Sequence, residues 1–193
     1  MEPVHTMETV SQTNTPTTTR KNVCFIHSTM YHIWKDEVLL HLLRAIVESG
    51  LINQLSMIYI NNIGDPLDPA KYKEIHESII VQNFSTSLEL FENCTIKSLH
   101  QYAKIHPDTN ILYMHTKGIS HEKDSQFVPG IFSWIRYMMY CLVHHHTSCL
   151  SLLEFYDAVG TNFKEKTNTQ PNPDHYSGNF WWARSDYINK LAV

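Results

Sequence analysis

The residues best suited to chemistry follow a short apolar run at positions 110–114. These are His115, Thr116, Lys117 and Gly118, which come directly where the run stops. Such a run is typical of a buried parallel strand, and in open α/β sheets ligands bind outside the carboxyl ends of the strands. Lysine offers a positive charge for phosphate, and glycine lets the backbone approach a ligand closely. The alternative is an ordinary β-turn, but two charge-capable side chains beside a glycine favour a phosphate site.

A second group of polar and aromatic residues lies near the carboxyl end of the chain. The residues there that could contact a sugar or an acceptor are His175, Ser177, Gly178, Asn179, Trp181, Trp182 and Arg184. Adjacent tryptophans in an extended segment point to opposite faces, so one can pack in the core while the other lines a pocket for a sugar ring. An arginine adds a bidentate donor for phosphate or carboxylate. The alternative is an edge strand whose tryptophans only fill the core.

His27, Ser28 and Thr29 end a first predicted strand, at residues 22–26, where a nucleotide would lie in a doubly wound sheet. No GxGxxG or GxxxxGK[ST] sequence follows them, which excludes a standard dinucleotide site and a P-loop. Capping of the next helix by Ser28 or Thr29 is the alternative. The triplet at residues 144–146 is all histidine, but consecutive helical residues point about 100° apart and cannot share one metal ion.

Composition sets limits on the class of protein. The chain has 193 residues, 42% of them hydrophobic, and a net charge of -4, which favours one domain with a real core. No basic face is evident, so we expect no nucleic-acid partner. No segment reaches the roughly 18 apolar residues that a membrane span needs. The four cysteines form no CxxC pair, so we expect reduced thiols in a soluble, cytoplasmic protein.

The order of predicted elements is that of an α/β protein. Strands are predicted at residues 22–26, 54–60, 78–84, 110–114 and 156–160, and helices at 37–48, 87–105 and 127–153, with a last helix beginning at Ser185. This alternation indicates a mostly parallel central sheet flanked by helices. The polar, turn-rich residues 1–20 are predicted to form a disordered tail, ahead of a single domain at 21–193.

Taken together, these segments resemble glycosyltransferases of the GT-A type. The chain is similar to the capsid-glycosylating enzymes of large DNA viruses and, more distantly, to bacterial rhamnan-synthesis proteins. The resembling segments are residues 25–28, 49–51, 112–118, 156–160 and 177–184. The resemblance implies a Rossmann-like domain, in the host cytoplasm if viral, that moves a sugar from a UDP- or GDP-linked donor to a glycan or glycoprotein acceptor. The donor-binding residues would be His27, Ser28, Thr29, Asn61, His115, Thr116, Lys117 and Gly118.

The resemblance also implies a metal site that this sequence alters. GT-A enzymes usually neutralise the diphosphate with a metal bound by an Asp-x-Asp motif, but here the strand ends in His115, Thr116 and Lys117. In one hypothesis Lys117 replaces the cation, and His115 bonds a phosphate or a sugar hydroxyl. In the other, His115 and His175 hold a divalent ion, for which imidazole ligands favour Mn²⁺ over Mg²⁺. Metal independence is favoured.

An inverting transferase further needs a carboxylate that takes the proton of the acceptor hydroxyl. Asp157, Asp174 and Asp186 lie near the resembling segments, and Asp157 is favoured because it lies on a predicted strand close to a glycine. A retaining enzyme would need no such base. Two other functions compete with the transferase: a catalytically inactive sugar- or nucleotide-binding module of the same fold, and a nucleotide-processing hydrolase, for which no nucleophile motif is present.

Overall fold

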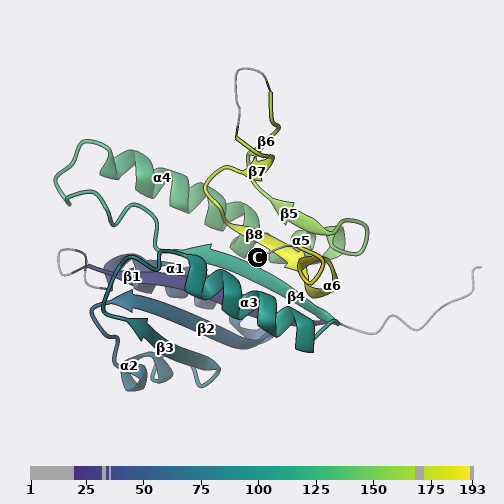
Figure 1. The fold of residues 1–193 in the computed structure, drawn as a ribbon, viewed down its shortest axis with the longest axis horizontal. Helices are drawn as coiled ribbons and strands as arrows, with labels where there is room; N and C mark the ends of the chain where they lie inside the picture. The colour runs from purple at the N-terminus through teal and green to yellow at the C-terminus, as the bar shows by residue number, and fades with distance from the viewer. Residues whose placement is uncertain (1–19, 32–33, 35, 168–171, 192–193) are drawn as a thin grey trace, which may run out of the picture.

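The computed structural model describes residues 20–31, 34, 36–167 and 172–191 (Figure 1). The predicted disordered tail falls outside these residues except at Arg20.

A central six-stranded sheet has the order β3-β2-β1-β4-β8-β5. Its strands are β1 (Lys21–Met30), β2 (Leu55–Gly64), β3 (Ile79–Ser85), β4 (Thr109–His115), β5 (Ala158–Gly160) and β8 (Trp181–Arg184). The pairs β1–β2, β1–β4 and β2–β3 are parallel, whereas β8 runs antiparallel to both of its neighbours. The predicted α/β fold with a mostly parallel central sheet is therefore confirmed. A separate two-stranded ladder joins β6 (Phe163–Lys164) to β7 (His175–Tyr176).

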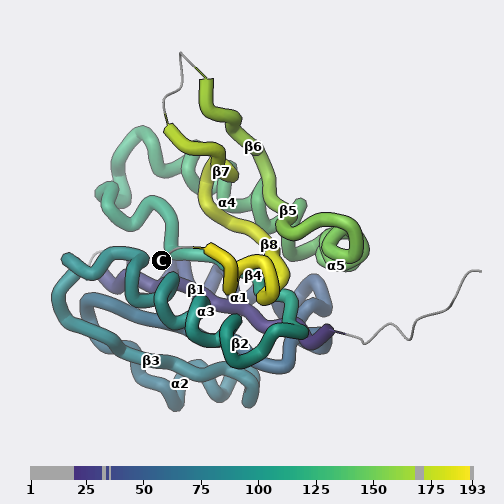
Figure 2. Tube along the Cα trace, turned by 45° about the vertical axis from the view of Figure 1, so that its right-hand side comes forward, coloured from purple at the N-terminus to yellow at the C-terminus, as the bar shows by residue number. Residues whose placement is uncertain are grey.

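Helices cover both faces of the sheet, which gives three layers (Figures 1 and 2). On one face lie α1 (Glu37–Glu48), α4 (Val128–Met139), the π-helical turn η2 (Tyr140–His144) and α5 (His146–Leu152). On the other lie α3 (Asn93–Ile105) and α6 (Ser185–Ile188). The short helix α2 (Pro69–Lys73) and the 3-10 turn η1 (Leu51–Gln54) complete the described elements. Among the described residues, no helix combines the length and apolar character that crossing a bilayer requires.

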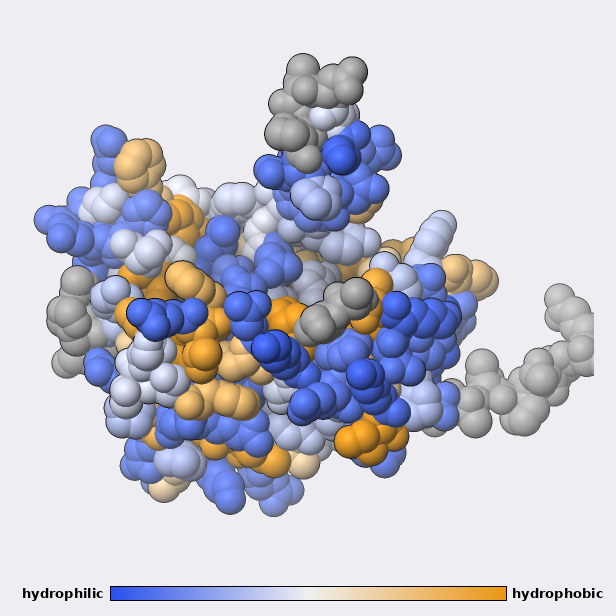
Figure 3. All heavy atoms as spheres, viewed as in Figure 1, coloured by the Kyte–Doolittle hydropathy of each residue, from blue (hydrophilic) through white to orange (hydrophobic). Residues whose placement is uncertain are grey.

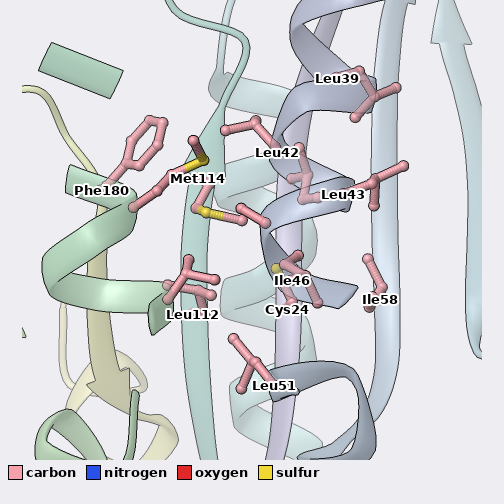
Figure 4. Packing of buried hydrophobic residues seen from close by; sticks show 14 of the residues in the cluster. Cys24, Leu39, Leu42, Leu43, Ile46, Leu51, Ile58, Leu112, Met114 and Phe180 are labelled. Atoms are coloured by element: carbon pink, nitrogen blue, oxygen red, sulfur yellow. The ribbon is translucent and has the colours of Figure 1, made fainter. Parts of the chain in front are cut away.

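Helix α1 shows how the sequence sets the core. Its bounds are the predicted ones, because leucine and isoleucine recur three or four positions apart and form one apolar face. Leu39, Leu42, Leu43 and Ile46 are buried against strand residues of β1, β2 and β4 (Figure 4). Full burial of each such side chain contributes about 1.5–3 kcal/mol to stability. The helix ends before Gly50, whose φ of 75° lies in the left-handed region.

Helix α3 begins later than predicted, at Asn93 rather than near Ser87. The preceding serines satisfy backbone groups in a non-helical conformation, since the Ser87 N–H donates to the Ser85 hydroxyl and the Glu89 N–H to the Ser87 hydroxyl. Such local side-chain bonds compete with the helix. The helix therefore starts directly after Glu92, which puts that carboxylate at its first turn.

The predicted helix at residues 127–153 is present but is interrupted by the π-helical turn η2. The carbonyl of Leu142 in this turn accepts a hydrogen bond of 2.8 Å from the indole of Trp182. Trp182 belongs to β8 and is fully buried. This bond ties the helices of one face to the antiparallel strand of the sheet.

Candidate functional site

Three neighbouring strands carry a polar row at the carboxyl edge of the sheet. His27 of β1 is in register with Asn61 of β2 and with His115 of β4. Phe25 and Tyr113, two positions earlier, pack on the side of α3, and side chains two apart on a strand share a face. The row therefore lies under the beginning of α3. The ring of His27 confirms this, because its Nδ1 is 2.9 Å from the hydroxyl of Thr95 in that helix.

Glu92, directly before α3, is the carboxylate of this edge. Its Oε2 accepts hydrogen bonds from the hydroxyl of Tyr113, at 2.6 Å, and from the side-chain amide of Asn179, at 2.8 Å. Its Oε1 is 3.7 Å from Nδ1 of His115. The side chain is 37% exposed, so the carboxylate is held from one side and open on the other. Glu92 is not among the predicted site residues, because the predicted helix began several positions too early.

The ring of His115 has a defined tautomer. Its Nε2 is 3.0 Å from the carbonyl oxygen of Gly178, which can only accept a hydrogen bond, so Nε2 carries the hydrogen. Burial lowers the pKa of His115 and nearby Lys117 lowers it further, whereas Glu92 and the Gly178 carbonyl act in the opposite direction. The neutral ring therefore presents the lone pair of Nδ1 towards Glu92.

His27 is neutral as well and joins two strand ends. Burial lowers the pKa of His27 to about 4, with Glu92 opposing and His115 adding to the shift. Its Nε2 is 3.0 Å from the hydroxyl of Thr29. The backbone N–H of Thr29 donates to the hydroxyl of Thr116 at 2.9 Å, and the backbone N–H of Thr116 donates to the carbonyl of His27 at 2.9 Å. These bonds fix the turn after β4 against the end of β1.

Lys117 and Gly118 form that turn. The ammonium of Lys117 is 4.5 Å from the centroid of the Trp134 ring of α4, a cation–π contact. Burial lowers the pKa of Lys117, and Glu92 raises it. Gly118 has a φ of 86°, and a Cβ there would lie 2.5 Å from Cγ2 of Ile131. The turn thus requires glycine both for its backbone conformation and for the close approach of α4.

Two adjoining pockets open at this edge. The larger has a volume of about 430 Å³ and is lined by His27, Thr29, Tyr31, Ile63, Leu88, Phe91, Glu92, His115, Thr116, Lys117, Gly118, Ile119 and Ser120. The smaller has a volume of about 290 Å³ and is lined by Glu92, His115, Lys117, His175, Tyr176, Ser177, Gly178 and Asn179. Glu92, His115 and Lys117 line both and so mark their boundary. In Figure 3 apolar residues gather near the beginning of α3 and are bordered by polar ones.

The structure brings most of the predicted site residues to these pockets. Of the predicted donor-binding residues, His27, Thr29, His115, Thr116, Lys117 and Gly118 line the larger pocket. Of the predicted sugar-binding residues, His175, Ser177, Gly178 and Asn179 line the smaller one. The two groups, about 60 positions apart along the chain, therefore meet at the end of β4.

Three predicted contact residues are instead enclosed. Ser28, Asn61 and Trp182 are 0% exposed, and none of them lines either pocket. Trp182 packs in the core, which leaves its ring no surface for a sugar. Trp181 faces the other side of β8, as its alternation predicts, and stacks on Tyr113 with ring centroids 5.1 Å apart. Its indole donates to Oδ1 of Asn179, so Trp181 supports the pocket wall from behind.

Asp157, Asp186 and Arg184 lie at the opposite edge of the sheet. Because β8 is antiparallel to β4, Arg184 is paired with Asn110 at the amino end of β4. His115 is five residue steps along the strand from Asn110, which corresponds to about 16 Å. There Arg184 forms ion pairs with Asp157 and, at 3.2 Å, with Asp186. The direction of β8 therefore places the predicted bases Asp157 and Asp186, and the predicted acceptor-binding residue Arg184, away from both pockets.

Asp174 and the two metal candidates are also placed by the structure. Asp174 is exposed, accepts a hydrogen bond from the backbone of Lys166 at 2.7 Å, and lines neither pocket. His115 and His175 both line the smaller pocket, but Nδ1 of His175 is engaged 2.7 Å from the carbonyl of Pro173. Within the described part of the chain, no three side chains among His, Cys, Asp and Glu are grouped so as to hold a metal ion. These two histidines are fewer ligands than a Mn²⁺ site usually takes, and both hypotheses, a Mn²⁺ ion or Lys117 in its place, stay untested predictions.

The fold and the site define a Rossmann-like α/β domain with ligand-sized pockets at the carboxyl ends of its parallel strands. The chain belongs to the family described as "Domain of unknown function (DUF8361)", whose model matches residues 37–193. No curated protein matches it in sequence.

Among solved structures, the chain is similar to a 4-diphosphocytidyl-2C-methyl-D-erythritol synthase, at 12% identity and a TM-score of 0.46, covering 89% of this chain and 78% of that one. It is also similar to the corresponding synthase from Anaerococcus prevotii DSM 20548, at 14% identity and a TM-score of 0.42, covering 90% of this chain and 78% of that one. A likeness at this level says nothing about activity.

Proposed function

We propose that the protein is a glycosyltransferase that moves a sugar from a nucleotide diphosphate donor to a glycan or glycoprotein acceptor. The observation that carries this proposal is the pair of adjoining pockets that share Glu92, His115 and Lys117. Small-molecule sites usually have volumes of about 300–1,000 Å³. The larger pocket, of about 430 Å³, suits a nucleotide, and the smaller, of about 290 Å³, suits a sugar.

The lining of the larger pocket suits a nucleotide in two parts. Ile63, Leu88 and Phe91 provide apolar and aromatic surface for a base, and the Phe91 side chain is available because the residue is 70% exposed. Thr29 and Thr116 add hydroxyl groups towards the turn after β4. A base would therefore lie against the loop before α3, with its phosphates directed towards that turn.

Lys117 is the counter-charge in this proposal. It lies where the pockets meet, which is where the diphosphate of a nucleotide sugar would join its two parts. A lysine acts on phosphate as a point charge. Neutral His115 cannot donate to a phosphate, because its one N–H is engaged with the Gly178 carbonyl. Of the two partners expected for His115, a sugar hydroxyl donating to Nδ1 is therefore the one that this geometry supports.

The alternative is an inactive sugar- or nucleotide-binding module of the same fold. It is favoured by one observation: the carboxylates predicted to act as base, Asp157, Asp174 and Asp186, do not line either pocket. The transferase and a module that binds nucleotide sugars both require donor binding and differ in whether nucleotide diphosphate is released, whereas a module that binds sugar alone requires no donor. Donor binding and release of nucleotide diphosphate therefore have to be measured on the same protein.

The decisive experiment is a panel of UDP- and GDP-sugars with thermal unfolding and release of nucleotide diphosphate as readouts, each with and without Mn²⁺. A donor at 100 times its Kd stabilises by about 2.7 kcal/mol, which for a chain of this size raises Tm by about 5–10 °C. We expect at least one donor to do so and to be turned over. A shift without any release would support the binding module, and no shift from any donor would overturn the transferase and any module that binds nucleotide sugars.

Lys117→Ala tests the counter-charge, with Lys104→Ala as the matched control. Lys104 is an exposed lysine near the end of α3 that lines neither pocket. We expect Lys117→Ala to lose the donor-dependent rise in Tm without added metal, and Lys104→Ala to retain it. An unchanged rise and unchanged turnover in Lys117→Ala would contradict the role of Lys117.

A further inference from the structure

We propose that Glu92 is the catalytic base of the transfer. It takes the proton from the hydroxyl of the sugar acceptor, and the reaction inverts the anomeric centre of the donor sugar. This inference rests on the proposed function. None of the carboxylates expected from the sequence reaches the pockets, whereas Glu92 lines both of them. It lies at the boundary between the pockets, beside the anomeric carbon of a donor whose sugar occupies the smaller pocket.

The two oxygens of Glu92 have different surroundings. Oε2 accepts two hydrogen bonds, from Tyr113 and Asn179, which fix the orientation of the carboxylate. No hydrogen bond to a described residue engages Oε1, which lies 3.7 Å from Nδ1 of His115. A base must be positioned and must keep a lone pair towards the substrate, and this arrangement meets both requirements.

His115 presents a second hydrogen-bond acceptor beside Glu92. The Gly178 carbonyl fixes the hydrogen on Nε2, so Nδ1 and Oε1 of Glu92 face each other as two acceptors. Two facing acceptors are favourable only when a donor lies between or beside them. A sugar hydroxyl is such a donor, and a neighbouring hydroxyl on the same ring can be received by the other acceptor.

In the proposed transfer one bond forms at the anomeric carbon as another breaks. The acceptor oxygen forms a bond to the anomeric carbon as the bond from that carbon to the diphosphate oxygen breaks. The bonding electrons leave with the nucleotide diphosphate, whose added charge lies near Lys117. The acceptor's proton passes to Oε1 of Glu92 and then to solvent. Attack from the face opposite the leaving diphosphate inverts the anomeric configuration.

Glu92→Gln tests this role without removing the side chain. The glutamine oxygen can still accept from Tyr113 and Asn179, and its amide can donate to Nδ1 of His115, so the local network is retained. Glu89→Gln is the matched control, because Glu89 is exposed on the same segment and lines neither pocket. We expect kcat in Glu92→Gln to fall about 100- to 10,000-fold, the usual contribution of a general base. The donor-dependent rise in Tm should persist in both variants.

The outcomes separate the two proposals. If no donor stabilises or is turned over by the unmodified protein, the proposed function fails. If the unmodified protein transfers sugar and Glu92→Gln does so at the same rate, or the product keeps the donor's anomeric configuration by NMR, the role of Glu92 fails alone. If Glu92→Gln loses donor stabilisation together with turnover, Glu92 is a binding residue and the base assignment is overturned. The pH profile gives a further readout, since a base predicts a rate that rises with pH to a plateau and a flattened profile in Glu92→Gln.

Discussion

The hydroxyl of Tyr113 donates a hydrogen bond of 2.6 Å to Oε2 of Glu92, which joins a residue of the core to a residue of the pocket. Tyr113 is fully buried on β4, so its ring cannot follow a moving side chain. Burial, reinforced by Glu92, raises the pKa of Tyr113 well above its usual value. The phenol therefore stays protonated and remains a donor to the carboxylate.

Tyr113→Phe should remove this donor and leave the ring packing intact. Hydrogen bonds to charged groups contribute about 1.5–3 kcal/mol, so we expect a loss of that order in the free energy of unfolding, measured in urea. Turnover should fall as well, because the orientation of Glu92 is less fixed. Tyr59→Phe is the control, since Tyr59 stacks on Phe25 on the same face of the sheet. Equal stability losses in the two variants would contradict a specific role for the Tyr113 hydroxyl.

His27 should make stability depend on pH. Its pKa is lowered in the folded protein from 6.5 to about 4, so between these values the unfolded chain binds more protons. The contribution of His27 to the free energy of unfolding is thus fully present above pH 6.5 and is lost as the pH falls towards 4. Its size is on the order of 3 kcal/mol. Urea unfolding between pH 4 and pH 6.5 should show a free energy of unfolding that rises with pH, and His27→Gln should reduce that slope. An identical slope in the variant would refute the attribution of this pH dependence to His27.

Gly118→Ala and Gly50→Ala should separate backbone strain from steric contact. Both glycines have positive φ, but a Cβ at Gly50 meets no atom within 4 Å, whereas at Gly118 it meets Ile131. Gly50→Ala should cost about 1–2 kcal/mol from strain alone. Gly118→Ala should cost about 1–3 kcal/mol more from overpacking. In the double variant Gly118→Ala/Ile131→Ala, the loss in the free energy of unfolding should be smaller than the sum of the losses in the two single variants. A loss equal to that sum would contradict the contact.

Asp157→Asn tests the corrected placement of the predicted base. Asp157 pairs with Arg184 at the amino edge of β4, and its side chain is 50% exposed. Partly exposed ion pairs contribute about 0–1 kcal/mol, so unfolding should change little. Turnover of any active donor should equal that of the unmodified protein. Loss of transfer with an unchanged fold would return Asp157 to the list of candidate bases.

The parallel half of the fold could be predicted because local patterns determine it. The apolar periodicity of residues 37–48 identified α1 with its observed bounds, and the apolar run at 110–114 identified β4 to within one residue at each end. Since ligands collect at carboxyl ends of parallel strands, His115 to Gly118 could also be placed in a pocket from the sequence.

The rest depended on relations that no local pattern encodes. The direction of β8 is set by its antiparallel pairing with β4. That direction places Arg184 and Asp186 at the amino end of β4, away from the pockets. Glu92 was missed because the serine turns before α3 displaced the helix start, and a single glutamate in a predicted helix interior carries no signal of its own. The register that aligns His27 with Asn61 and His115 likewise required the assembled sheet.

The walls of the two pockets differ in how firmly they are built. Gly178 and Asn179 lead directly into β8, which is hydrogen-bonded to a strand on each side. Residues 86–92, which include Leu88 and Phe91 of the larger pocket, form turns instead of strand or helix. In the proposed function, the sugar would therefore contact a rigid pocket wall, and the nucleobase would contact a wall that can adjust to its size. We expect strict discrimination among donor sugars and tolerance among nucleobases.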